Sequence, residues 1–142
     1  MTYTLDTLPA GINFLDHLDR QADIPTVTRC AAQGDLLIAA TNAMTRKTVA
    51  RPNARWVDVP VEGVAIIDGT NTGGHSHTLH GAARITFDVQ HPSNLAICLI
   101  EVLGLATVQH PEHGALILDA GTGLFECRGQ REQAEEIRRV QD

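Results

Sequence analysis

A chain of 142 residues with 43% hydrophobic and 20% charged residues has the size and composition of one globular domain. The formal net charge of −6 argues against nucleic acid as a partner, because binding to the phosphate backbone depends on lysine and arginine. No apolar run reaches the length of about 18 residues that a membrane-spanning helix needs, and no secretion signal is recognisable at the N-terminus. We therefore expect a cytoplasmic protein that makes no contact with a membrane.

The beginning of the chain has a helical pattern. The residues spaced to share one face of a helix are Ile12, Phe14, Leu15 and Leu18. Pro25 marks the limit of that pattern. The sequence predicts a short helix here.

From residue 26 onward, short apolar runs alternate with clusters of Gly, Pro, Asn and Asp, which is typical of strands and turns. The runs are residues 26–31, 35–41, 56–61, 64–68, 83–89, 95–103, 105–109, 115–118 and 124–128. Two of them, 57–61 and 85–89, alternate apolar and polar residues, so each should bury one face. The pattern predicts a mainly β fold, a small single-domain barrel or sandwich.

Near the end of the chain, residues 115–118 and 124–128 flank a glycine-containing link, residues 119–123. Glycine supplies the positive φ that hairpin loops need, so we predict that these two runs pair as an antiparallel hairpin. Residues 133–139 contain strong helix formers, and a short C-terminal helix or a charged tail fits them equally well.

The three cysteines, Cys30, Cys98 and Cys127, cannot all pair within one chain. They lie in apolar runs, and no export signal precedes them. We expect free thiols in or near the core and no disulfide.

One stretch departs from the acidic character of the chain. Residues 45–56 contain Arg46, Lys47, Arg51 and Arg55 and no acidic residue. This stretch is either a solvated loop or a surface that docks onto an acidic one.

Histidines carry the strongest chemical signal. In the segment Gly74-His75-Ser76-His77, the two histidines would project from the same face of a strand, while His80 would face the other side.

A second group follows in His110-Pro111-Glu112-His113, where a proline-containing turn brings His110 and His113 together. We predict that His75, His77, His110 and His113 lie close together and bind a divalent transition metal, with zinc as the favoured ion. Solvated histidines in polar loops are the alternative.

The spacing from Gly69 to His75-Ser76-His77 resembles the first half of the metal motif of cupins, which are small β-barrels. Cupins carry a glutamate four or five residues after the second histidine, where this chain has Gly81 and Ala82. The resemblance is confined to this half-motif.

A wider resemblance rests on four segments in order: Gln33-Gly34-Asp35, Gly74-His75-Ser76-His77, His110-Pro111-Glu112-His113 and Gln130-Arg131-Glu132. They resemble those of a family of small bacterial and bacteriophage proteins. The resemblance implies a compact β-rich domain, residues 33–142, preceded by an N-terminal extension that holds the short helix, residues 1–32. It implies paired histidines at positions 75, 77, 110 and 113, and no particular activity.

Two functions are consistent with these features. The first is a non-enzymatic structural or assembly protein, phage-encoded and associated with a virion as a capsid accessory or decoration protein. Its histidines would bind a stabilising metal or lie at an interface, and its partners would be other proteins or further copies of itself. The second is a small cupin-like metal-dependent enzyme that uses the same histidines, with Glu112 as a ligand or general base.

Overall fold

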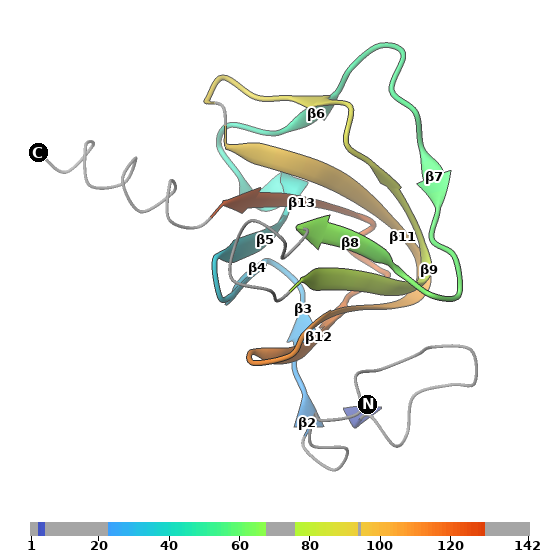
Figure 1. Ribbon diagram of the computed structural model, residues 1–142. Coiled ribbons are helices and arrows are strands. Elements are labelled where there is room, and N and C mark those ends of the chain that lie inside the picture. Colours follow the sequence, from blue (N-terminus) through green and yellow to red (C-terminus); the bar gives the residue numbers. More distant parts are fainter. Residues whose placement is uncertain (1–2, 5–22, 68–75, 94, 130–142) are drawn as a thin grey trace, which may run out of the picture.

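The computed structural model describes residues 3–4, 23–67, 76–93 and 95–129. Most of these residues lie in strands that form one nearly closed, barrel-shaped sheet (Figure 1). The strands are β1 (Tyr3–Thr4), β2 (Asp23–Ile24), β3 (Thr26–Val27), β4 (Cys30–Gln33), β5 (Leu36–Ala40), β6 (Val49–Ala50), β7 (Val57–Asp58), β8 (Val64–Ile67), β9 (His77–Thr86), β10 (Val89–Gln90), β11 (Ala96–His110), β12 (Gly114–Leu118) and β13 (Leu124–Gly129). The only helix within the described residues is the 3₁₀ turn η2 (Thr41–Ala43).

The predicted mainly β, single-domain fold is therefore confirmed, and of the two predicted forms, barrel or sandwich, the sheet has the shape of a barrel. The expected N-terminal helix and the possible C-terminal helix fall outside the described residues. None of the helical structure described is long and apolar enough to cross a membrane.

β11 is the central strand of the sheet. One edge of β11 pairs antiparallel with β9, and the other pairs with β13 and then, further along β11, with β12. The sheet continues through β5 and β4 beyond β13, and through β3 beyond β12, whereas β7 and β8 add to the far edge of β9. A separate two-stranded sheet of β6 and β10 lies at the upper end of the barrel in Figure 1.

The predicted hairpin between residues 115–118 and 124–128 is wrong in its pairing. Both segments are strands, but β12 and β13 lie one after the other along the same edge of β11 instead of pairing with each other. The tight hairpin is the one between β11 and β12, closed by residues 111–113. Because β11 is 15 residues long, it offers room for both short strands.

β11 extends through both of the apolar runs, residues 95–103 and 105–109, that were expected to be separated at Gly104. A register shift between Val102 and Ala106 lets β9 and β11 pass this point without ending, and both strands bend there. Gly81 lies opposite with φ +106°, and a Cβ on it would stand 2.3 Å from the carbonyl oxygen of Leu105. Only glycine allows the strands to come this close.

The barrel interior is filled by apolar side chains from β5, β9, β11, β12 and β13. The largest fully buried members are Leu36, Ile38, Leu79, Ile85, Ile100, Val108, Leu118 and Phe125. The expected buried face of residues 57–61 is formed only at Val59, which packs against the core. β7 is a two-residue edge strand, and Val57 is 48% and Val61 70% exposed.

All three cysteines are free, as predicted. Cys98 and Cys127 are buried and lie directly opposite each other on β11 and β13, whereas Cys30 is exposed, contrary to expectation. A hydrogen bond with Cys127 and burial raise the pKa of the Cys98 thiol, so this pair belongs to the inert, packed class of cysteines.

Candidate functional site

Three of the predicted histidines meet at one end of the barrel. His77 begins β9 and His110 ends β11, and the register that pairs Thr78 with Gln109 places the two histidines opposite each other. Their ring centroids are 4.4 Å apart, and the centroids of His110 and His113 are 4.6 Å apart. The expected proximity is thus observed for these three, while His75 falls outside the described residues.

Gln33, the last residue of β4, connects this group to the barrel wall. Its Nε2 donates hydrogen bonds to the backbone carbonyl oxygens of Val108 and Gly114, both at 3.0 Å. Its Oε1 lies 2.9 Å from Nδ1 of His77. A single side chain, only 2% exposed, therefore ties β4 to β9, to β11 and to the start of β12.

Gly34 makes space for the third histidine. It has φ +58°, and a Cβ on it would stand 2.6 Å from Cδ2 of His113. Two residues of the Gln-Gly-Asp segment thus lie against the histidines: Gln33 orients His77, and Gly34 accommodates His113. The late Gln-Arg-Glu segment, residues 130–132, is outside the described residues.

The hydrogen-bond partners determine the tautomers of the two buried rings. Because both hydrogens on Nε2 of Gln33 point at carbonyl oxygens, its Oε1 must accept from Nδ1–H of His77, which leaves Nε2 of His77 as an acceptor. His110 has the opposite tautomer. Its Nδ1 accepts from the backbone N–H groups of Glu112 at 3.1 Å and His113 at 3.3 Å, so Nε2 of the neutral ring carries the hydrogen.

These tautomers bear on metal binding. His77 has the arrangement of a metal-ligating histidine, with one ring nitrogen held by a carbonyl oxygen and the other available as an acceptor. His110 could bind a metal through Nε2 only if its hydrogen moved to Nδ1 and both turn contacts were lost. Within the described residues, no group of three or more His, Cys, Asp or Glu side chains is placed to hold a metal ion.

Burial keeps His77 neutral. Burial, the largest cause, acts together with the positive charges that His110 and His113 carry when protonated to lower the pKa of His77 from 6.5 to about 4, while Asp35 opposes the shift. A neutral His77 retains its acceptor at neutral pH, which suits either a hydrogen bond or a metal.

The lowered pKa of His77 predicts an acid-sensitive fold. The unfolded chain takes up this proton near pH 6.5 and the folded chain only near pH 4, so stability is complete above pH 6.5 and falls as the pH drops toward 4. Between about pH 7.5 and about pH 4.5, the unfolding free energy of the wild type should fall by about 2–3 kcal/mol more than that of His77→Asn. Urea unfolding in the presence of EDTA measures this, and parallel pH profiles for the two proteins would contradict it.

His80 is not part of this group, as the alternation of the strand predicted. Its Nε2 lies 2.9 Å from Oγ1 of Thr78 on the other face of β9, and burial lowers its pKa. Its Nδ1 is buried with no hydrogen-bond partner. His80 therefore packs against the outer face of the sheet and does not point toward His77.

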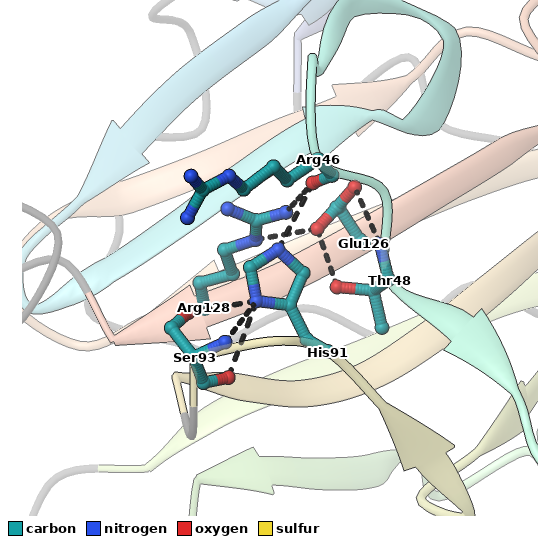
Figure 2. A network of polar contacts seen from close by, with 6 residues as sticks. All are labelled: Arg46, Thr48, His91, Ser93, Glu126 and Arg128. Atoms are coloured by element: carbon teal, nitrogen blue, oxygen red, sulfur yellow. Dashed lines mark hydrogen bonds and ion pairs between the residues drawn. The ribbon is translucent and has the colours of Figure 1, made fainter.

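The structure reveals a second polar cluster (Figure 2), on the face of β13 that points away from the core residues Phe125 and Cys127. The Glu126 carboxylate accepts from Nε of Arg128 at 2.5 Å, from Oγ1 of Thr48 at 2.6 Å and from the Thr48 backbone N–H at 3.4 Å. Glu126 is 0% and Arg128 3% exposed, so this is a buried ion pair. The sequence signal was the spacing of two opposite charges two residues apart in an apolar strand, which places them on one face.

The same cluster holds the backbone of the loop that precedes β6. Nη2 of Arg128 donates to the carbonyl oxygen of Arg46, and Nε2 of His91 donates to that oxygen at 3.0 Å. Nδ1 of His91 accepts from the backbone N–H of Ser93 at 3.1 Å, which orients the ring (Figure 2).

A family model described as a domain of unknown function (DUF8820) matches residues 32–130 of the chain. No curated protein and no solved structure matches it.

Proposed function

Since the chain belongs to the DUF8820 family of domains of unknown function, whose description names no activity, we propose a function from its own geometry. The protein acts as a non-enzymatic structural component of a protein assembly. Its histidine group stabilises the end of the barrel. The resemblance to bacteriophage proteins supports a virion as that assembly, with this chain as an accessory or decoration protein.

The observation that carries this proposal is the set of hydrogen bonds made by the Gln33 side chain. Both hydrogens of its amide and its oxygen contact three separate strands or turns, and His77 is the partner of that oxygen. In the same way, Nδ1 of His110 accepts two backbone N–H groups of the turn that follows it. Groups that hold strands together in this way support a stabilising role, whereas a general base needs its acceptor directed at a substrate.

Fractionation of the untagged protein from cells that produce it tests the assembly role. We expect the protein in particles much larger than its own 15.3 kDa, whatever the other components are. Recovery at the size of a free monomer, at the natural protein level, would contradict the proposal.

Metal binding by the histidine group is a second candidate, favoured by the orientation of His77. Its acceptor Nε2 and the exposed His113 could share an ion with His75, with zinc as the favoured metal. The ion would stabilise the barrel or, in the alternative of a cupin-like enzyme, activate water with the help of Glu112.

Elemental analysis of untagged protein, followed by thermal unfolding with EDTA or added zinc, tests the metal. If the group binds zinc, the ion should raise the unfolding midpoint of the wild type and of the control His91→Ala, but not of His77→Ala. Equal unfolding midpoints with and without zinc would contradict zinc binding. The histidine group would then stabilise the end of the barrel through its hydrogen bonds alone. A metal-loaded protein would justify a screen for hydrolytic activity.

A further inference from the structure

The loop of residues 45–56 is the most basic surface of the described structure. Arg46, Lys47, Arg51 and Arg55 are all exposed, and the loop itself contains no acid. In Figure 1 it runs over the top of the barrel, through β6 and down to β7. The whole chain has a formal net charge of −6, and the loop is positively charged. The residues outside the loop therefore carry a net negative charge larger than that of the whole chain.

This loop is held in place by buried charges. Thr48 in its first part bonds to Glu126, and the Arg46 carbonyl accepts from Arg128 and His91 (Figure 2). In its second part, the Arg51 backbone N–H donates to the carbonyl oxygen of Asp88 at 2.9 Å. A loop whose backbone is already ordered loses little conformational entropy when it binds a partner.

Two large apolar side chains accompany the cations. Val49 is 47% exposed on β6, and Phe87, next to Asp88, is 49% exposed. The carboxylate of Asp88 is itself occupied by the Arg55 backbone N–H at 2.7 Å. We call the surface made by Val49, Phe87 and the four cations the basic rim. Apolar anchors among charges are typical of protein interfaces, whereas nucleic-acid sites are dominated by cations.

A surface of complementary character lies where β9 and β11 bend. The turn after β7 presents Val61, 70% exposed, and an exposed Glu62, and β11 presents Leu103, 61% exposed. The side chain of Asp58 on β7 is 89% exposed and lies 3.5 Å from Nε of Arg84, which also pairs with Glu101 at 3.7 Å. Together with Glu62, these two acids outnumber the cation Arg84, so the surface keeps a net negative charge. We call Asp58, Val61, Glu62 and Leu103 the acidic bend. The Val59 backbone N–H donates to the carbonyl oxygen of Ala83 at 3.0 Å, and a Cβ on Gly104 would stand 3.1 Å from Cβ of Ala82. The turn and β11 therefore lie on the two sides of β9 at this point.

We propose that the basic rim of one copy of this protein docks onto the acidic bend of a second copy. The two surfaces carry opposite charges, and each has exposed apolar side chains to bury. Contact between two basic rims would be repulsive, so each rim faces a bend. Where a single rim–bend contact joins two copies, the pairing is head-to-tail, and its repetition builds a ring or a filament. The inference rests on the proposed assembly role and names the protein itself as one partner.

Two variants of the full chain test this pairing. Lys47→Glu with Arg55→Glu reverses the rim, and Asp58→Arg with Glu62→Arg reverses the bend. These side chains are exposed, so the fold should persist, which circular dichroism checks. Arg29→Glu is the matched control, an exposed cation outside the rim.

Sedimentation velocity should show that the wild type and Arg29→Glu associate at about 0.05 M salt and dissociate at about 0.5 M. Each double variant alone should associate at least about tenfold more weakly. An equimolar mixture of the two should associate again, through the intact rim of one and the intact bend of the other.

A wild type that stays monomeric at low salt, a rim variant that associates normally, or a mixture that fails to associate would overturn the inference. If the recombinant protein is monomeric while the natural protein is found in large particles, the head-to-tail contact is wrong and the assembly role stands. If both are monomeric, both fail.

Discussion

Replacing Gln33 by alanine is expected to lower the free energy of unfolding by about 3–4 kcal/mol. The substitution removes three hydrogen bonds, two of them buried, and takes one partner from Nδ1–H of His77 and from each of two backbone carbonyl oxygens. It also opens a cavity at a position that is 2% exposed. Urea denaturation at neutral pH measures the loss.

Two further variants separate the causes of this loss. Gln33→Leu fills most of the cavity but restores no hydrogen bond, so it should recover only the smaller part of the lost stability. Gln90→Ala, at an exposed glutamine of β10, should change the free energy of unfolding by less than about 0.5 kcal/mol. A Gln33→Ala protein as stable as Gln90→Ala would show that the histidine end of the barrel does not depend on Gln33.

Replacing Glu126 by leucine is expected to cost about 3–5 kcal/mol, because it leaves the charge of Arg128 buried without a counter-ion. Removing both charges, with Glu126→Leu and Arg128→Met together, should recover much of that stability, since apolar side chains of similar volume can replace a buried ion pair. Chemical denaturation of the single and double variants measures both effects.

The matched control is the exposed pair of Arg84 and Glu101, whose charged atoms lie 3.7 Å apart with side chains 41% and 45% exposed. Glu101→Ala should cost less than about 1 kcal/mol because water screens this pair. Equal losses in Glu101→Ala and Glu126→Leu would mean that the Glu126 pair is not buried in solution.

Local patterns in the sequence were sufficient for the class of fold. Runs of strand-forming residues bounded by turn residues predicted a β-barrel or sandwich, because side-chain alternation and turn chemistry act over a few residues. The same local reasoning placed His80 on the face of β9 opposite His77 and kept the cysteines unpaired.

Part of the candidate site was also predictable. A strand and a proline-containing turn were expected to bring His77 near His110 and His113, and they do. The role of Gln33 was not predictable, because its partner Val108 lies 75 residues away and nothing local identifies a glutamine that will be buried.

Long-range pairing was decided only by the tertiary structure. The sequence shows that residues 115–118 and 124–128 are strands, but not that both would lie along β11, because a strand's pattern specifies its faces and not its neighbour. For the same reason, Arg128 meets the Arg46 carbonyl across 82 residues, and the two histidines meet at 4.4 Å only because β9 and β11 share one register. The identity of the residues in each segment determined the kind of element that it forms. The packing of distant strands determined which residues contact each other.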